Sequence, residues 1–354
     1  MGWVMDERKS IDVARTFANY AIVLMHAWAA QQYVVKGTWE HRVWDFVCNA
    51  MTAAVLPGLF LISGYLLMHD YSVSTYGKKI WRRVKRLMVP YLVWNLTFVA
   101  FYLGVCKFVP RMGQRVASFG LNTWQGAFDK VVSFMVDPID MPTWFMRTLF
   151  LYALGSLLIW FLLRRWKGLM TYLFLAVVFV VTLYMGWGSR LKFTYPFYSL
   201  LCFTVGMHVA QSGKSLFSMF QSKWWLLPVV IGMCGLFWHG IRWHWDYSPV
   251  RDISFMMMAP FLFTTASWFS RLPDLLPKWN FVKSSSFFLY TGHFLFCSMV
   301  LHTLAPLFSN WQGYGKLTFL IVVFCTLGVA VNLVAYWIGK RLFGNVFGAW
   351  DGTL

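Results

Sequence analysis

The residues R-K-S-I-D-V-A-R-T-F-A-N-Y-A-I-V-L-M-H-A-W (8–28) decide the fold class, because they read as a membrane helix with a polar stripe. A helix needs roughly 20 mostly apolar residues to cross a bilayer. Four polar side chains interrupt this run: Asp12, Arg15, Asn19 and His26. At about 100° per residue all four fall within an arc of about 60°, so they share one face of the predicted helix.

The composition places the whole chain in a membrane. Of 354 residues, 59% are hydrophobic and only 12% are charged, whereas a soluble domain carries about 25% charged residues. No long polar tract separates a soluble module, so we expect one transmembrane domain over residues 1–354. The net charge of +18 resides largely in short loops, which favours membrane topology and anionic ligands over nucleic acid.

Hydropathy predicts an all-α bundle of about ten transmembrane helices. The predicted spans are 11–33, 46–69, 87–107, 143–163, 169–187, 194–212, 224–241, 253–270, 285–307 and 317–340. The segment 111–135 is too polar to span and is expected to form a loop outside the membrane, with an interfacial helix near 123–135. Lys and Arg are more frequent in the loops on the side of the N-terminus, so both termini are expected in the cytoplasm.

Cysteine and histidine patterns do not predict a metal site. The six cysteines are scattered, and no two of them have the C-x-x-C spacing of a zinc or redox site. His239 and His244 lie five residues apart in W-H-G-I-R-W-H-W (238–245), which is the wrong spacing for one helical face. We interpret this segment as an aromatic and cationic outer rim.

The polar stripe of the first helix allows two interpretations. Asp12 and Arg15 are three residues apart and can form a structural ion pair, with His26 as a core histidine. Alternatively, the stripe lines a polar path and His26 acts as a base near the middle of the membrane, because ionisable groups in spans usually face a cavity. His26 lies about 21 Å from Asp12 along the helix axis.

A basic segment, K-K-I-W-R-R-V-K-R (78–86), forms the predicted inner loop before the third span. Four of its cations lie at the start of that span: Arg82, Arg83, Lys85 and Arg86. They can simply be positive-inside charges. The guanidinium groups of the three arginines also suit phosphate oxygens, so a cytosolic anion such as a coenzyme pyrophosphate is the functional alternative.

Three further segments carry candidate residues. The run L-P-G-L-F-L-I-S-G-Y-L-L (56–67) predicts a helix that packs closely at its glycines, with Ser63 as a hydrogen-bonding group. Trp144 is expected at the outer start of a helix, where an interfacial aromatic anchor is the simple interpretation. His293 lies inside the ninth predicted span and is either a core histidine or a substrate contact.

Together these segments resemble acyltransferase family 3, the ten-helix membrane O-acyltransferases that modify bacterial glycans. The family's first helix has an arginine, ten residues and a histidine, matched here by Arg15 and His26. The other matching segments are F-L-I-S-G-Y (60–65), R-V-K-R (83–86), W-F-M-R-T-L (144–149) and S-F-F-L-Y-T-G-H (286–293). One departure is T-F-A-N-Y after Arg15, where the family often has G-L or G-I, and this places Asn19 on the polar face.

The resemblance implies an O-acyltransferase, most simply an O-acetyltransferase, of the bacterial inner membrane. Acyl-CoA would be the co-substrate, with acetyl and succinyl both open, and a cell-surface or lipid-linked glycan would be the acceptor. His26 would be the general base, and Asp12 and Arg15 would orient the path. The coenzyme phosphates would bind Arg83 and Arg86, beside Arg82 and Lys85. No metal is implied.

Some roles stay open at this point. Ser63, Asn19, Trp144 and His293 are candidates for contacts with the substrate or with a developing oxyanion. The expected partners are acyl-CoA, the glycan acceptor and membrane lipids, and a second copy of the chain is an open alternative. Direct attack on the thioester needs no covalent acyl-enzyme, which agrees with the lack of an evident nucleophile. A multi-span transporter or flippase for a glycan or small anion is the alternative function.

Overall fold

The computed structural model describes most of the chain and is all-helical. The described residues are 7–33, 37–105, 120–121, 123–133, 138–165, 169–188, 198–220, 222–243, 249–270, 274, 278–311 and 313–352. Helices account for 90% of the structure, and the described part contains no strand. The predicted all-α class is therefore confirmed.

Five helices of the described residues are long and apolar enough to cross a membrane. They are Trp39–Met68, Val73–Gly104, Met141–Arg165, Trp279–Phe308 and Lys316–Asp351. Each contains one predicted span, namely 46–69, 87–107, 143–163, 285–307 and 317–340, apart from residue 69 of the first and residues 105–107 of the second. Residues 106–107 of the second of these spans lie outside the described residues.

The other five predicted spans are helical but shorter or more polar. The first is α1 (Glu7–His26), which continues as a 3-10 helix, η1 (Ala27–Tyr33). The others are α8 (Leu169–Gly188), α9 (Tyr198–Gln211), α11 (Leu226–Trp243), and α12 (Pro249–Met258) with α13 (Pro260–Trp268). Residues 194–197 of the sixth span are not described. The count of ten spans stays a prediction.

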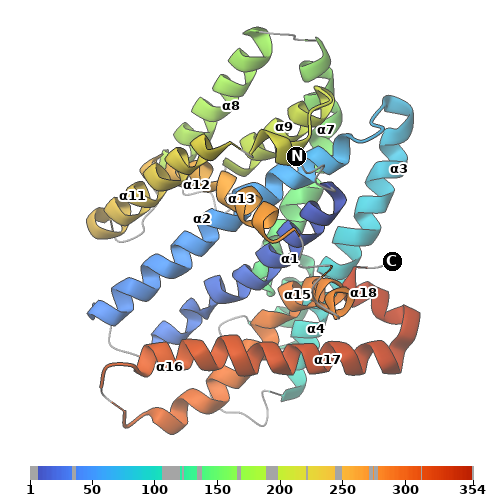
Figure 1. Cartoon of the computed structure of the whole chain (residues 1–354). Coiled ribbons are helices and arrows are strands. Elements are labelled where there is room, and N and C mark those ends of the chain that lie inside the picture. Colours follow the sequence, from blue (N-terminus) through green and yellow to red (C-terminus); the bar gives the residue numbers. More distant parts are fainter. Residues whose placement is uncertain are drawn as a thin grey trace. The chain divides into compact units, whose positions relative to one another are not determined.

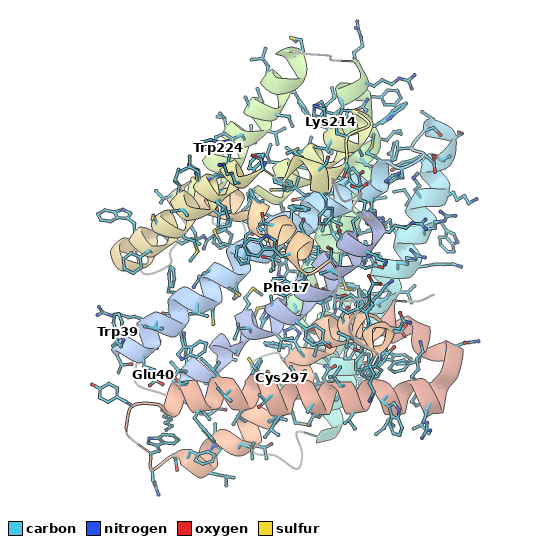
Figure 2. The ribbon with its side chains drawn as sticks, viewed as in Figure 1. Phe17, Trp39, Glu40, Lys214, Trp224 and Cys297 are labelled. Atoms are coloured by element: carbon cyan, nitrogen blue, oxygen red, sulfur yellow. The ribbon has the colours of Figure 1, made fainter. Side chains whose placement is uncertain are left out.

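The chain divides into two compact units. Unit 1 contains residues 1–28, 37–80 and 152–283, and unit 2 contains residues 29–36, 81–151 and 284–354. In unit 1, α2 (Trp39–Met68) is the central helix and packs against α1, α9, α11, α12 and α13. Figure 1 shows α1 and α2 side by side. At the start of α2, Trp39 is 77% exposed (Figure 2).

Glycines determine how closely α2 and α9 approach in unit 1. A Cβ atom on Gly64 would lie 2.0 Å from the carbonyl oxygen of Phe203, and one on Gly206 would lie 2.1 Å from that of Leu61. Real Cβ atoms essentially never approach a backbone oxygen so closely. The prediction of close packing at the glycines of 56–67 is therefore confirmed at Gly64, and α2 remains helical through Pro57.

Unit 2 contains α4 (Val89–Val105), α6 (Trp124–Val132), residues 144–151 of α7 (Trp144–Arg165) and most of α15 (Trp279–Leu304). It also contains α16 (Lys316–Val323) and α17 (Val329–Phe343), which a π-helical turn, η7 (Phe324–Gly328), joins into one rod (Figure 1). α6 confirms a helix within the segment 123–135. Residues 111–119 of the predicted outer loop are not described.

After α17 the chain turns back into unit 2. Gly344 has a φ of +53°, and the 3-10 helix η8 (Gly344–Phe347) and α18 (Gly348–Asp351) follow. The Trp350 indole donates to Thr97 Oγ1 at 3.1 Å, and the Trp94 indole donates to the Trp350 carbonyl at 3.0 Å. α18 is thereby fixed to α4.

The basic segment 78–86 is helical and not a loop, which corrects the prediction. It comprises the end of α3 (Val73–Arg83) and part of a π-helical turn, η2 (Val84–Met88), which leads without a break into α4. Lysine and arginine are good helix formers, and the neighbouring transmembrane helix supplies a nucleus to extend. The 32-residue helix Val73–Gly104 is about 48 Å long at 1.5 Å per residue, about 18 Å more than the hydrocarbon core.

Candidate functional site

The N-terminal turn of α1 is held by contacts within unit 1. Glu7 Oε1 accepts hydrogen bonds from the Ser215 hydroxyl at 2.8 Å and from the backbone N–H of Leu216 at 2.9 Å. The buried Tyr65 lies within hydrogen-bonding reach of the same carboxylate. Tyr65 is the last residue of F-L-I-S-G-Y, so this segment contributes a side chain that fixes the position of α1.

Two ion pairs add to this anchor. Lys9 Nζ lies 2.9 Å from Asp274 Oδ1, and Lys283 Nζ lies 2.5 Å from Asp12 Oδ2. The sequence suggested Arg15 as the partner of Asp12, and the structure records Lys283 at the start of α15. Asp12 thus holds the end of the polar stripe to the first turns of α15, which belong to unit 1, while the stripe runs on toward His26.

The polar stripe is the accessible side of α1. Arg15 is exposed, and Asp12, Asn19 and His26 are partly exposed, whereas most of the remaining α1 surface is buried. The buried set includes Ile11, Ala14, Ala18 and Ile22. The apolar side of α1 packs in unit 1, and the four polar side chains lie on its more exposed side.

The imidazole of His26 has a defined tautomer. Nδ1 lies 2.9 Å from the carbonyl oxygen of Ile22, one turn earlier in α1. A carbonyl oxygen only accepts hydrogen bonds, so Nδ1 carries the proton and donates it. In the neutral ring, Nε2 therefore carries the lone pair and is the nitrogen that can accept a proton. His26 is also the last residue of α1, where the helix tightens to 3-10 geometry.

The basic segment presents cations along a helix that extends beyond the hydrocarbon core. Arg82, Lys85 and Arg86 are exposed and Arg83 is partly exposed. Lys85 Nζ lies 5.8 Å from the centre of the Trp81 ring, within the range of a cation–π contact. The π turn at 84–88 changes the direction in which these side chains project around the helix axis, compared with a regular helix leading into α4. Such π turns occur frequently at functional sites.

Comparison with known proteins gives one family. An acyltransferase domain family matches residues 8–339, which is nearly the whole chain and includes the stripe, the basic segment and His293. The chain belongs to this acyltransferase family. No curated protein and no solved structure matches the chain. With five apolar helices of spanning length, it is a membrane acyltransferase.

The remaining predicted residues of the acyltransferase fall in both units. Ser63 is partly exposed and lies one residue before the close contact at Gly64 in unit 1. Trp144 is only 8% exposed, and its indole packs edge-on against Phe145. Its role as an interfacial anchor or as a substrate contact stays a prediction.

His293 is fully buried in unit 2, as a core histidine would be, and its role as a substrate contact stays a prediction. Its Nδ1 lies 2.7 Å from the carbonyl oxygen of Tyr290 and 3.2 Å from that of Leu289, so Nδ1 is again the donor. The outer-rim interpretation of 238–245 is wrong for His239, which has no exposed surface, although Trp238 is 58% exposed. His244 lies outside the described residues.

The predicted site residues are divided between the two units. Asp12, Arg15, Asn19, His26 and Ser63 belong to unit 1, and Arg82, Arg83, Lys85, Arg86, Trp144 and His293 belong to unit 2. Sequence reasoning missed Asp140, a buried acid before α7. The signal was an aspartate directly before M-P-T-W, at the start of an apolar helix.

Proposed function

We propose that this acyltransferase moves an acyl group, acetyl in the simplest case, from cytoplasmic acyl-CoA to a sugar hydroxyl of a cell-surface or lipid-linked glycan. The proposal is supported by the family, by the accessible polar stripe of α1, and above all by the Nδ1–H tautomer of His26. That tautomer makes Nε2 the proton acceptor, which is the property that O-acylation requires of a base.

The reaction needs one base and no covalent acyl-enzyme. His26 Nε2 removes the proton of the sugar hydroxyl as its oxygen attacks the thioester carbon. The carbon–sulfur bond then breaks, and the coenzyme thiolate leaves and is protonated by the imidazolium. The products are the sugar ester and free coenzyme A, and His26 returns to its neutral state. The backbone carbonyl of Ile22 keeps the ring in the required tautomer throughout.

The binding of the acyl donor is assigned to the basic segment 78–86. Arg82, Arg83, Lys85 and Arg86 hold the coenzyme phosphates, since guanidinium groups bind phosphate oxygens in pairs of hydrogen bonds. Their exposed positions leave them available to a cytosolic anion. The 18 Å or so of this helix that exceeds the hydrocarbon core keeps the charges out of the lipid tails.

The membrane topology is part of the same proposal. Ten spans with both termini in the cytoplasm of a bacterial cell place the basic helix on the side of acyl-CoA. Cysteine substitutions at Lys78 and at Trp124, in a background without reactive native thiols, test this arrangement. A membrane-impermeant thiol reagent should label the second position in intact cells and the first only after lysis. The reverse pattern would contradict the topology.

The deciding experiment separates donor binding from transfer. His26→Ala should keep acetyl-CoA binding and lose incorporation of labelled acetyl into glycan, while Arg83→Ala together with Arg86→Ala should weaken binding itself. Lys214→Ala removes an exposed cation of unit 1 (Figure 2) and is the matched control. Full transfer by His26→Ala would disprove its role as base. Glycan export without acyl transfer would favour the alternative of a transporter or flippase.

A further inference from the structure

Asp140 is the most unusual polar residue of the described chain. It precedes the helix Met141–Arg165 in unit 2, and none of its surface is exposed. Neither carboxyl oxygen has a hydrogen-bond partner in the structure as described. Buried polar groups are nearly always hydrogen-bonded, and an ionised carboxylate without a partner is among the costliest groups to bury. This carboxyl therefore requires an explanation.

The backbone around Asp140 is rigidly held. Its N–H donates to Asn95 Oδ1 at 3.1 Å, and its carbonyl oxygen accepts from the Thr143 hydroxyl at 2.6 Å. The Asn95 amide in turn donates to the carbonyl of Tyr91 at 2.8 Å. The carboxyl is thus the one unsatisfied group in a cluster of satisfied ones, and it is fixed in place before any ligand arrives.

The hydroxyl of Tyr290 is near the Asp140 carboxyl but already donates a hydrogen bond elsewhere. Tyr290 lies within electrostatic reach of Asp140, yet its hydroxyl donates to the carbonyl of Pro142 at 2.6 Å. The Tyr290 ring stands edge-on to Phe145, with 6.3 Å between ring centres. The carboxyl therefore lies beside aromatic side chains and has acceptor positions that the described chain does not fill.

The chain reaches the surface of unit 2 within one residue of the carboxyl. Met141 is 48% exposed, while Asp140 before it and Pro142 after it are buried. Fixed carboxylates beside aromatic rings suit sugars, whose hydroxyls donate hydrogen bonds and whose C–H faces pack on rings. In the proposed topology this turn lies at the outer end of its helix, the side from which a surface glycan arrives.

We infer that Asp140 binds the acceptor, its carboxyl group receiving hydrogen bonds from hydroxyls of the sugar beside the Tyr290 ring. The inference rests on the proposed function, which it extends by naming the acceptor subsite. Asp140 is a binding residue and not the base. Its loss should weaken acceptor binding and leave the donor untouched.

The test uses the full chain and two separate readouts. The probe is glycan extracted from cells that lack the gene, incubated with labelled acetyl-CoA and protein purified in detergent. Asp140→Asn should raise the KM for glycan at least tenfold and leave the Kd for acetyl-CoA within twofold. Asp140→Glu, which keeps the charge but displaces it, should give an intermediate KM. Asp129→Asn, in the exposed part of α6, is the matched control.

Each outcome decides the inference. An unchanged KM in Asp140→Asn would overturn it and leave the proposed function standing. A variant that no longer folds would show that the carboxyl is a structural group, and this also overturns the inference. If the wild-type protein transfers no label to any extracted glycan, the proposed function fails and the acceptor subsite fails with it. A raised KM with unchanged donor binding and a melting temperature no lower than that of the wild type supports it.

Discussion

Gly64 and Gly206 lie where α2 and α9 cross closely in unit 1, each approaching a backbone carbonyl of the other's helix. A Cβ atom on either would lie about 2 Å from a carbonyl oxygen, a distance that only movement of the helices can relieve. α2 carries Ser63 beside this crossing and packs against α1, which carries His26. Gly64 therefore sets the position of α2, the helix that packs against α1 and its polar stripe.

The first prediction follows from this crossing. Gly64→Ala should lower the free energy of unfolding by about 1–3 kcal/mol and reduce acyl transfer, because α2 and α9 must separate. Thermal melting in detergent and a transfer assay measure both effects. Gly155→Ala in α7 is the control, since nothing lies within 4 Å of a Cβ atom there. It should be neutral or slightly stabilising. Equal melting temperatures for the two variants would contradict the crossing.

The second prediction concerns the Asp12–Lys283 pair. Both side chains are partly exposed, at 33% and 45%, so the pair should contribute only about 0.2–1 kcal/mol. Melting temperatures of Asp12→Asn, Lys283→Met and the double variant give the coupling energy by a double-mutant cycle. The exchange Asp12→Lys with Lys283→Asp should restore most of the transfer activity. If the exchanged variant is folded but does not recover transfer activity, Asp12 acts on the substrate and is not only an anchor.

The third prediction uses the ionisation of Asp140. Burial raises the pKa of the Asp140 carboxyl well above its ordinary value. A folded-state pKa above the unfolded one means that stability is fully present below the unfolded pKa, about 4, and is lost as pH rises through the folded pKa. Asp140→Asn cannot ionise, so its melting temperature relative to wild type should increase as pH rises above about 4. A constant difference between the two proteins across pH would contradict this.

The fourth prediction distinguishes phosphate binding from a general positive charge. Arg86→Lys keeps the charge of the basic helix but loses the paired hydrogen bonds of a guanidinium. It should weaken acetyl-CoA binding by about tenfold, and Arg86→Gln by more, with the loss largest at low ionic strength. Isothermal titration at two salt concentrations measures this. If Arg86→Lys binds acetyl-CoA as tightly as the wild type, the positive charge alone accounts for the contribution of Arg86.

The fifth prediction concerns the returning C-terminal segment. Trp350→Phe removes the indole N–H that donates to Thr97 and keeps most of the ring. It should cost about 0.5–1.5 kcal/mol, the usual contribution of one hydrogen bond. Trp337→Phe, on the exposed side of α17, is the control and should melt like the wild type. A larger loss from the control would show that the segment is not fixed to α4 as described.

Local patterns in the sequence were sufficient for much of this protein. The all-α class, the positions of five spanning helices and the shared face of Asp12, Arg15, Asn19 and His26 follow from hydrophobicity and from the period of the helix. The tautomer of His26 is also local, because its partner lies four residues earlier. The helical state of 78–86 was missed because its charge suggested a loop, although the same residues favour a helix next to α4.

Contacts between distant residues were decided by the tertiary structure alone. Lys283 is the partner of Asp12 from 271 residues away, and Gly64 meets α9 some 140 residues later. Asp140 became a candidate only because Asn95 and Thr143 fix its backbone while folding removes its carboxyl from water. A sequence shows which side chains share one helix face, but burial and partner choice depend on how separate helices pack, and no local period encodes that packing.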